Sequence, residues 1–572
     1  MKILGINHDM YISSAVLMEN GKIAAGGAEE RFIREKQTRN FPSHAIEFCL
    51  KKSGNIIKDI DYITSSWNPG VYLKNYNPLF SDKRRWKAEH LFSVPDNIFK
   101  LFDEKTKNSI DHVEQTIFMD NTCCRLVYVT HHLAHAANGF FPSPFETAAI
   151  LTADAQGELE ATTFCLGKGN KINKIKSIDY PQSMGAFYST ITEYLGFRPN
   201  SDEWKVMALA GFHKGGDEYY KKFKENLFSL QPDGEYEFDL TYFQGYNHEQ
   251  PHLFTEKLVR LLGPAHSPRA PVEDRHYAIA AALQQSSEEI AVHMLNWLYK
   301  ETQCKSLCLS GGFFMNSVFN GRVLSLTPFE DLFISPCPDD SGNSIGAALY
   351  LHHHILGNTK RHALTHNFFG PEYSDREIES VINKFGIRYR VEQNIEKACA
   401  EFIAEGKLVG WFQGRMEFGQ RALGNRSILA DPRDPSTKDK VNMAVKFRES
   451  FRPFAPAVLE EDAKDYFKFG PNSSVPFMEK VYMIPEDKRA QIPAVTHVDG
   501  SGRLQTVSKA ANPRFHKMIC EFKALTGLPI VLNTSFNLNG EAIVCTPEDA
   551  LRTFFSCGLD ILIMGQHIIT KG

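Results

Sequence analysis

The chain has 572 residues, more than one hydrophobic core normally organises, so we expect at least two domains. Its formal net charge is −4, and its share of hydrophobic residues, 42%, is ordinary for a globular protein. This balance excludes a global attraction to nucleic acid or to an anionic membrane, so any anion site must be a local concentration of charge.

The cysteines and the N-terminus indicate the compartment. The 11 cysteines are scattered and form no C-x-x-C pair, which is typical of free thiols in a reducing compartment. The N-terminus runs into KILGIN and then polar residues instead of an apolar signal core, and no later run reaches the length of a membrane span. We therefore expect a cytoplasmic protein with no membrane partner.

The first elements alternate strand and turn signals. The apolar runs KILGIN and SSAVLM are followed by an Asn20-Gly21 turn and the run KIAAGGAEE, and Asn-Gly between apolar runs is a strong hairpin signal. A helix is expected at AIEFCLKKSG, ending near Gly54, and a strand at DYITSSW. Three strands and a helix return at AAILTADA, ELEATTFCLGKG, KINKIKSIDY and MGAFYSTITEYLGF. The repetition predicts an internally duplicated α/β unit, the arrangement of the actin, Hsp70 and sugar-kinase superfamily.

The rest of the chain divides at a predicted linker. A long helix is expected at about 274–301, with apolar residues at a helical spacing that suits core packing. After it come the strand SLCLS, a helical stretch FFMNSVFNGRVLS, and SPCPDDSGNSIGAALYLHHH, whose histidines 352–354 we interpret as a solvated helix end. Residues 356–372 are rich in His, Asn and Gly and predict a linker. We expect one α/β domain over residues 1–360 and a second over residues 373–572.

The segment THHLAHAANGFF predicts a metal site. On a helix, His131 and His135 share one face, whereas His132 points about 100° away. Asp154 ends the expected strand AAILTAD, and Asp340 lies in a turn before a helix, both at places where α/β sheets bind ligands. Two imidazoles and two carboxylates suit Fe(II), Mn(II) or Zn(II) better than Ca(II). We expect the ion to anchor a phosphate and not to supply the nucleophile.

A glycine pair predicts a second polar site in the same domain. Gly311 and Gly312 follow a strand and precede a helix, where backbone N–H groups and the helix dipole favour an anion or a nucleotide. Asn316 and Asn320, one turn apart, add polar contacts for a ribose or a base. Ordinary turn chemistry explains the pair of glycines equally well, so both interpretations stay open.

Cations are concentrated between residues 414 and 454 around a motif broken by glycines, GRMEFGQRALGNRS. They are Arg415, Arg421, Arg426, Arg433, Lys446, Arg448 and Arg452. Guanidinium groups bind phosphate and carboxylate oxygens bidentately, while Lys is a compact point charge, so the mixture suits a site for more than one phosphorylated ligand. A solvated basic surface is the alternative, and the interleaved glycines and phenylalanines favour a folded loop. Farther on, Asn533, Ser535 and Asn537 come just after the apolar strand LPIVL. They could form a polar binding site or simple Asx and Ser turns, and both interpretations stay open.

Long motifs in both parts of the chain resemble one family. In the C-terminal part they are GRMEFGQRALGNRS, VKFRESFRPFAPAV, RLQTVSKAANPRFH and VLNTSFNLNGEAIV. In the N-terminal part they are EERFIREK, HHLAHAANGFF, SMGAFYSTITEYLG and SGGFFMNSVFNGR. In this order, over nearly the whole chain, they resemble the NodU/CmcH O-carbamoyltransferases. The resemblance implies a TsaD-like N-terminal domain, a duplicated actin/Hsp70-like fold of two ribonuclease H-like halves, followed by an α/β YrdC-like C-terminal domain.

The resemblance also implies a reaction in two steps. In the family, the YrdC-like domain cleaves carbamoyl phosphate and condenses the carbamate with ATP, giving carbamoyl-adenylate and pyrophosphate. The TsaD-like domain, related to the tRNA threonylcarbamoyl-transfer enzyme, then passes the carbamoyl group to a hydroxyl of the acceptor. ATP is thus expected as co-substrate with Mg(II), carbamoyl phosphate as donor and Fe(II) as the bound metal.

The resemblance assigns roles to residues of this chain. The metal ligands of the family fall on His131, His135, Asp154 and Asp340. Lys36 in EERFIREK falls on a position at the transfer site, and with His8, Lys446 and Arg421 it is a candidate catalytic residue. Besides Gly311, Gly312 and Asn316, the residues expected to hold carbamoyl phosphate and ATP are Arg421, Arg426, Lys446, Arg448, Arg452, Arg503, Asn533, Ser535 and Asn537.

Two departures from the family pattern concern the transfer site. Many members carry a His-Asp pair directly before the small-residue strand, whereas this chain has Tyr11-Ile12 there and His8-Asp9 three residues upstream. Either the turn is rebuilt so that His8 and Asp9 reach the acceptor, or the hydroxyl is activated differently. The family segment G-K-x-M-x-L-A reads WKVMALA here, which keeps Lys205 and places Trp204 where the pattern has glycine.

Two other classes of function stay open. A small-molecule kinase of the actin/sugar-kinase superfamily would release ADP without carbamoyl phosphate, and it gives the arginine-rich second domain no role. A non-enzymatic, nucleotide-gated binding protein would bind ATP and release no pyrophosphate. The acidic balance and the lack of a basic stripe argue against a nucleic-acid partner. We expect a small-molecule hydroxyl acceptor, a sugar or a secondary metabolite, and the choice between monomer and homo-oligomer stays open.

Overall fold

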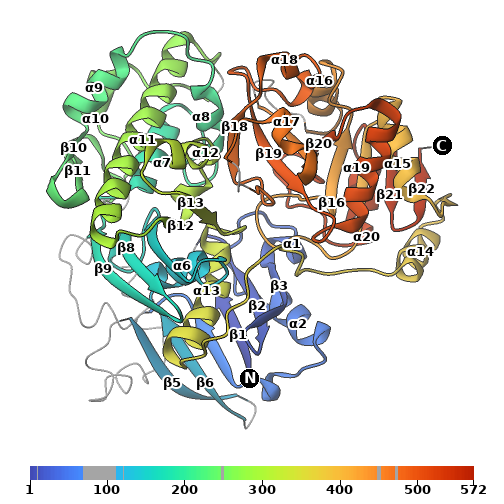
Figure 1. Cartoon of the computed structure of the whole chain (residues 1–572), viewed down its shortest axis with the longest axis horizontal. Coiled ribbons are helices and arrows are strands. Elements are labelled where there is room, and N and C mark those ends of the chain that lie inside the picture. The colour runs from blue at the N-terminus through green and yellow to red at the C-terminus, as the bar shows by residue number, and fades with distance from the viewer. Residues whose placement is uncertain are drawn as a thin grey trace.

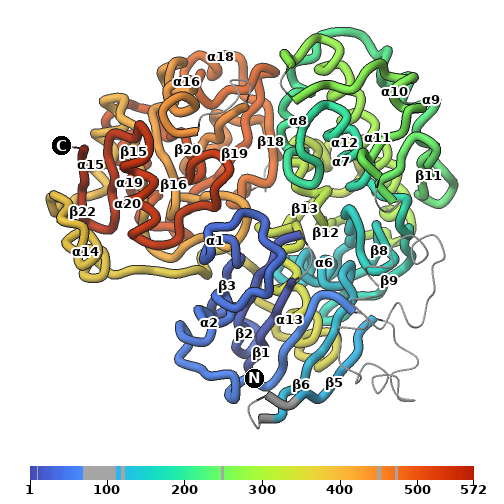
Figure 2. The backbone as a smooth tube through the Cα atoms, turned by 180° about the vertical axis from the view of Figure 1, so that it is seen from behind, coloured from blue at the N-terminus to red at the C-terminus, as the bar shows by residue number. Residues whose placement is uncertain are grey.

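The computed structural model describes residues 1–8, 11–68, 111–119, 122–246, 250–268, 270–446, 452–470 and 474–571. A six-stranded and a five-stranded sheet come from the first part of the chain, and a nine-stranded sheet comes from the last part. In Figure 1 the two smaller sheets lie in the lower half, with a green helical lobe and the orange-to-red C-terminal part above them. The lobe and the C-terminal part also lie side by side when viewed from behind (Figure 2).

The two smaller sheets share one topology. The first has the order β3 (Lys22–Ala28), β2 (Ser14–Glu19), β1 (Lys2–Asn7), β4 (Tyr62–Ser65), β6 (Thr122–Val129) and, at its edge, β5 (His112–Met119). The second has the order β9 (Lys171–Asp179), β8 (Glu160–Lys168), β7 (Thr147–Ala153), β12 (Ser306–Ser310) and β13 (Asp331–Ile334). In both, an antiparallel meander is followed by two strands parallel to its first strand. The predicted duplication, and with it the actin-like class of the N-terminal part, is confirmed.

Local signals explain the first of these halves. The predicted hairpin turn joins β2 to β3, and its residues Asn20 and Gly21 have φ angles of 49° and 81°, the positive values that a tight two-residue hairpin turn needs. Helix α2 (Ser43–Lys52) follows, and Gly54 ends it with a φ of 66°. The strand expected at DYITSSW is β4.

Helices α6 (His131–Phe140) and α13 (Asn343–Leu349) lie where the two halves meet (Figure 1). Helix α13 packs on β1, α6 packs on β7 and β12, and the two helices pack against each other. They approach closely because the facing residues are small: a Cβ on Gly346 would lie 1.9 Å from the Ala134 carbonyl oxygen. The start of α6 and the turn before α13 are thereby brought together.

The helical lobe covers the second sheet. It contains α7 (Met184–Tyr194), α8 (Glu203–Ala210), α9 (Glu218–Asn226), α10 (Glu256–Leu262), α11 (Asp274–Thr302) and α12 (Ser317–Leu326), with the small hairpin β10 (Phe228–Leu230) and β11 (Tyr236–Phe238). Apolar residues of α11 at helical spacing, among them Leu283, Ile290 and Leu298, are fully buried in a core shared with β7 and β12. The core role predicted for this helix is confirmed.

The C-terminal part is a mixed α/β domain, in agreement with the predicted class. Its sheet has the order β14 (Arg390–Val391), β22 (His567–Thr570), β21 (Ile561–Met564), β15 (Val409–Phe412), β16 (Arg426–Ala430), β20 (Ile530–Ser535), β17 (Ala455–Leu459), β19 (Ser501–Val507) and β18 (Lys480–Met483). Helices α15 (Ile395–Ala404) and α19 (Pro513–Thr526) pack against each other, and α20 (Pro547–Phe555) packs on β15 and β21.

The helical lobe contacts the C-terminal sheet through α12 and β18. A Cβ on Gly321 would lie 1.8 Å from the Val481 carbonyl oxygen, so only glycine permits this approach. The amide of Asn320 donates to the carbonyl oxygens of Phe314 and Glu479, at 2.7 and 2.9 Å. Asn320, expected to contact a ribose or a base, therefore connects the lobe to the C-terminal sheet.

The triple histidine is not a solvated helix end, so that interpretation is wrong. His352 and His353 are 5% and 0% exposed, in the helical segment η7 (Tyr350–Ile355). His353 packs against Phe141 with ring centroids 4.8 Å apart, and His354 Nδ1 accepts the backbone N–H of Ile172. Burial lowers the pKa of His352 and of His354 to about 4. Polar residue types concealed their burial, because the strand that covers them lies far away in the sequence.

The eleven cysteines are all free thiols, as their scattered spacing predicts. Among the described helices, none is long and apolar enough to cross a membrane.

Candidate active site

A cavity of about 1450 Å³ lies between the N-terminal halves, the helical lobe and the C-terminal sheet. Asp154 and Asp340 line it on the N-terminal side, and Lys446, Asn533 and Asn537 line it on the C-terminal side. Pockets for a single small ligand rarely exceed about 1000 Å³. The space is therefore large enough for more than one ligand, and it connects the two predicted sites.

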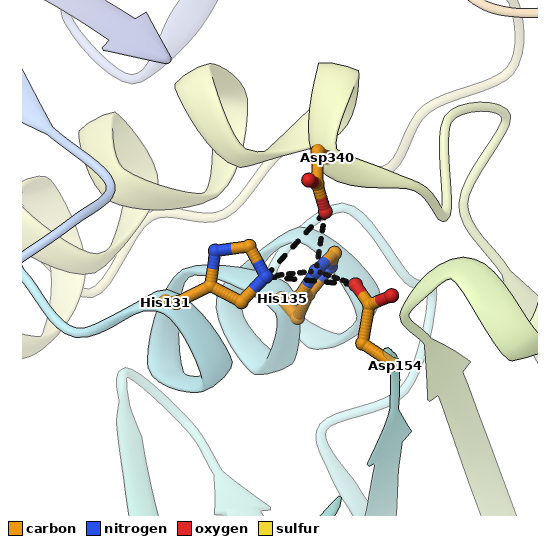
Figure 3. Close-up of side chains that lie close together, drawn as sticks. All are labelled: His131, His135, Asp154 and Asp340. Atoms are coloured by element: carbon orange, nitrogen blue, oxygen red, sulfur yellow. Dashed lines mark hydrogen bonds and ion pairs between the residues drawn. The ribbon is translucent and has the colours of Figure 1, made fainter. Parts of the chain in front are cut away.

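The predicted metal ligands lie together at the N-terminal end (Figure 3). Helix α6 presents His131 and His135 on one face, with their Nε2 atoms 3.1 Å apart. Asp154 follows β7, and its Oδ2 is 2.8 Å from His135 Nε2 and 3.5 Å from His131 Nε2. Asp340 begins the turn η6 (Asp340–Gly342), and its Oδ1 is 3.4 Å from both nitrogens. One ligand atom from each of the four residues thus lies within 4.8 Å of the others.

The chemistry of this cluster fits a divalent cation. Burial lowers the pKa of His131, but the carboxylates of Asp340 and Asp154 outweigh it and raise the pKa to about 10. Burial raises the pKa of Asp154, and the two histidines in turn hold it well below its usual range. The two facing Nε2 atoms can share only one proton along their line, whereas a metal ion accepts both lone pairs. Buried imidazole and carboxylate ligands of this kind suit Fe(II), Mn(II) or Zn(II).

A second layer of groups orients these ligands. Asn343 Nδ2 lies 3.3 Å from His131 Nδ1, and Ser310 Oγ lies 3.5 Å from His135 Nδ1, so both rings turn Nε2 toward the carboxylates. The backbone N–H of Tyr11 donates to Asp340 Oδ2 at 3.1 Å. No sequence pattern indicated these partners, because Asn343, Ser310 and Tyr11 are each far away in the sequence from the ligand that they contact.

The carboxylate of Glu158 caps the N-terminus of α6. Its carboxylate accepts the backbone N–H of His131 at 3.0 Å and that of Asn68 at 2.7 Å. Burial raises the pKa of Glu158 to about 7, although the nearby His131 lowers it. A carboxylate at the N-terminus of a helix satisfies free N–H groups and the helix dipole, so Glu158 fixes the helix that carries the histidines.

At the C-terminal end, Lys446 contacts Ser535 and Asn537, two of the polar residues that follow the strand LPIVL. Lys446 is 3% exposed and ends the helical segment η8 (Asn442–Lys446), and its Nζ lies 2.7 Å from Asn537 Oδ1 and 2.5 Å from the Ser535 carbonyl oxygen. Ser535 Oγ donates to Asn537 Oδ1, and Asn533 Nδ2 donates to Gln505 Oε1 at 2.8 Å. The contacts with Ser535 and Asn537 hold the buried ammonium of Lys446 at the cavity wall.

The glycine-broken motif is a loop at the contact between the two parts of the chain. Phe418 is buried in the N-terminal core, and Gly419 has a φ of 125°, in the region that favours glycine. Gln420 Nε2 donates to Asp339 Oδ2 at 2.7 Å. The loop thereby places Arg421 in the cavity wall, where burial lowers its pKa to about 10 and Asp339 opposes that shift, so it stays charged at neutral pH.

The other predicted cations separate into two groups. Arg452 and Arg503 also line the cavity, the latter from β19. Arg415 donates to the carbonyl oxygens of Ala24 and Phe369, and the exposed Arg433 forms an ion pair with the buried Asp431. Arg448, like Asp9, lies outside the described residues.

The structure contradicts the ligand-binding role expected for Arg426. Its side chain is fully buried, and its guanidinium donates to the carbonyl oxygens of Gln413 at 2.7 Å and Pro371 at 3.0 Å while resting on the ring of Phe412 at 3.7 Å. Because carbonyl groups already use these donors, Arg426 holds the loop that carries Arg421. Its sequence neighbourhood is the same as that of the cavity arginines, so only the fold separates them.

His8 and Lys36, the residues expected near a transfer site, both line the cavity. The ring of His8 meets Phe41 edge to face with centroids 5.3 Å apart. Desolvation in the cavity lowers the pKa of Lys36; Glu30 opposes this shift and Arg452 adds to it. Burial and the charge of Glu203 raise the pKa of Tyr11, so its phenol stays protonated at neutral pH.

The glycine pair contributes one cavity residue. Gly311 has a φ of 104°, and a Cβ there would lie 2.2 Å from the Ala153 carbonyl oxygen, so close strand packing requires the glycine. Its N–H donates to the Pro338 carbonyl oxygen, whereas Gly312 lines the cavity beside Asp154. Asn316 also lines the cavity, and it caps α12.

Comparisons with known proteins identify the family. Residues 2–349 match the family described as Carbamoyltransferase N-terminus, and residues 400–571 match Carbamoyltransferase C-terminus. The chain therefore belongs to the carbamoyltransferase family, as its motifs predicted, and is a transferase enzyme.

Several relatives share most of its length. Nodulation protein NolNO of Sinorhizobium fredii is 35% identical over 99% of this chain and 80% of its own. The 3'-hydroxymethylcephem-O-carbamoyltransferase of Amycolatopsis lactamdurans is 28% identical over 76% of this chain and 79% of its own. An uncharacterized protein of Synechocystis is 36% identical over 100% of this chain and 96% of its own.

Proposed function

We propose that this protein is an ATP-dependent O-carbamoyltransferase with two reaction centres in one cavity. The C-terminal centre would make carbamoyl-adenylate from carbamoyl phosphate and ATP. The N-terminal centre would transfer the carbamoyl group to a hydroxyl of a small-molecule acceptor. The observation that carries the proposal is that the cation cluster around Lys446 and the His-Asp cluster line the same cavity.

At the C-terminal centre, the work of the protein is to hold two polyanions together. Water hydrolyses carbamoyl phosphate to carbamate and phosphate, and an oxygen of the carbamate then attacks the α-phosphorus of ATP and displaces pyrophosphate. Carbamate and ATP repel each other, so Arg421, Arg452 and Arg503 would screen their charges and stabilise the leaving pyrophosphate. Lys446, held by Ser535 and Asn537, would add a fixed ammonium. Mg(II) would accompany ATP.

At the N-terminal centre, the acceptor hydroxyl would attack the carbamoyl carbon, and AMP would leave. Lys36 and His8 are the candidates for taking the hydroxyl proton, since both line the cavity. The lowered pKa of Lys36 increases the share of neutral amine, the form that accepts a proton. A divalent ion held by His131, His135 and the two aspartates, with Fe(II) as the expected ion, would supply a cationic anchor for the phosphate of the adenylate.

The single cavity supports a protected route between the centres. Carbamate and its adenylate are consumed by water, so a reaction that makes them at one site and uses them at another gains from an enclosed passage. The acceptor class we propose, a sugar or a secondary metabolite, rests on relatives named for nodulation and for a cephem O-carbamoyltransferase. Both donor substrates are cellular metabolites, in keeping with a cytoplasmic location.

The test is a product assay with ATP, Mg(II) and carbamoyl phosphate. We expect AMP and pyrophosphate, formed only when carbamoyl phosphate is present. ADP release without carbamoyl phosphate would instead support a small-molecule kinase, and tight ATP binding with no turnover would support a binding protein. A screen of hydroxyl compounds by mass spectrometry, seeking the gain of one carbamoyl group, then identifies the acceptor.

A further inference from the structure

Trp204 of α8 and Arg452 of the C-terminal part meet inside the cavity. The guanidinium carbon of Arg452 lies 4.0 Å from the centre of the Trp204 ring, and both residues line the cavity. Arg452 is only 7% exposed. A guanidinium over an indole face is attracted by the ring, most strongly where water is excluded. The pair therefore joins the transfer domain to a cation of the donor centre.

The indole ring is the fixed member of this pair. Its Nε1–H donates to the Ser201 carbonyl oxygen at 3.1 Å, which ties the ring to the turn before its own helix. The same turn is held by an ion pair between Lys205 and Asp202 at 3.1 Å. A ring fixed in this way offers a flat face on which the guanidinium of Arg452 rests, so the direction of its N–H groups depends on the ring.

The neighbours of Trp204 belong to the transfer centre. Glu203 accepts a hydrogen bond from Ser189 Oγ at 2.6 Å, and its charge acts on Tyr11, the residue whose backbone N–H holds Asp340. The charge of Arg452 in turn acts on Lys36. Consecutive residues of α8 thus face the two centres, with Trp204 at the boundary between them.

We propose that Trp204 is a positioning residue that orients Arg452 for the donor reaction and keeps bulk water out of the passage between the two centres. This inference rests on the proposed function. Without the indole face, the guanidinium of Arg452 would turn away from its ligand, and water would reach carbamoyl-adenylate before transfer. A residue that only fills space would affect stability and both reactions to the same extent.

The test needs no known acceptor, because water can take that place. Carbamoyl-phosphate-dependent exchange of labelled pyrophosphate into ATP measures formation of the adenylate, and AMP release without an acceptor measures its loss to water. The variants are Trp204→Ala and Trp204→Phe. The matched control is Trp297→Ala, since the Trp297 ring faces Lys176 Nζ at 3.9 Å and neither of these residues lines the cavity.

For Trp204→Ala, we expect the KM for carbamoyl phosphate in the exchange assay to rise about tenfold. AMP release per exchange event should rise severalfold. Trp204→Phe should restore most of both values, and Trp297→Ala should leave both as in the wild type. The inference would be overturned if Trp204→Ala kept the wild-type KM and AMP release, even with a lower melting temperature. It would also be overturned if Trp204→Phe showed the same defect as Trp204→Ala. Absence of exchange in the wild type would instead overturn the proposed function.

Discussion

The two ends of the cavity are built in opposite ways. At the N-terminal end, two histidines and two aspartates bring one ligand atom each to within 4.8 Å of one another, and their charges are balanced within the cluster. At the C-terminal end, cations come from separate loops and strands around a larger space. The first arrangement suits one small cation and the second suits large anions. A pair of ligands on one helix is visible in a sequence, whereas a site spread over many segments becomes visible only in the fold or through a resemblance.

If the ends perform different steps, damage to one must leave the other working. The largest effect is expected for Lys446→Met, which removes the buried ammonium held by Ser535 and Asn537. We expect AMP formation from ATP and carbamoyl phosphate to fall about 1000-fold. The control is Arg433→Gln, which removes an exposed cation of the same stretch that does not line the cavity. Equal losses in both variants would mean that bulk charge, not this site, drives the step.

Asp154→Asn should impair metal binding and transfer at the N-terminal end of the cavity. It replaces a carboxylate 2.8 Å from His135 Nε2 with an amide of the same size. We expect bound metal, measured by mass spectrometry of the purified protein, to be lost and carbamoylation of the acceptor to fall about 100-fold. Asp434→Asn serves as control, because the exposed carboxylate of Asp434 pairs with two exposed residues, Ser436 and Lys440. Full metal content with full transfer would contradict the assignment of this cluster.

Arg426→Met tests whether Arg426 stabilises the fold or binds a ligand in the cavity. The substitution leaves several buried carbonyl groups without their hydrogen-bond donor, so we expect the free energy of unfolding to fall by about 2 kcal/mol. Below the melting transition, the KM for ATP should match the wild type. Unchanged thermal stability together with a raised KM would return Arg426 to the donor site.

The smallest expected effect is a pH dependence of stability far from the cavity. The pKa of His354 is about 4 in the folded protein and near 6.5 when unfolded, so between these values only the unfolded chain takes up the proton. This contribution is complete above about pH 6.5 and is lost as the pH falls toward 4. Because the ring is partly exposed to solvent, we expect this contribution to the free energy of unfolding to be about 1 kcal/mol. His354→Phe should flatten the thermal stability profile over this range by that amount, and an unchanged profile would show that the residue does not titrate as inferred.

Local spacing predicted much of the N-terminal part. The Asn20-Gly21 hairpin, the repeated order of strands and the pair His131 and His135 depend on residues close in the sequence, and the structure places them as expected. Asp154 was found because the ends of parallel strands collect at one edge of a sheet.

The sequence alone could not predict groups whose partners lie hundreds of residues away. Arg426 and Arg421 have similar neighbours, yet one faces carbonyl groups and the other faces the cavity. The burial of His353 and the contact of Trp204 with Arg452 likewise depend on the packing of distant segments. Such contacts follow from tertiary structure, for which residue type and spacing carry no signal.

The most direct test of two centres in one cavity is carbamoyl-phosphate-dependent exchange of labelled pyrophosphate into ATP, measured side by side in Asp154→Asn and Lys446→Met. We predict exchange near the wild-type rate in Asp154→Asn and its loss in Lys446→Met. Loss of exchange in both variants, or exchange that persists in both, would contradict the division of the reaction between the two ends.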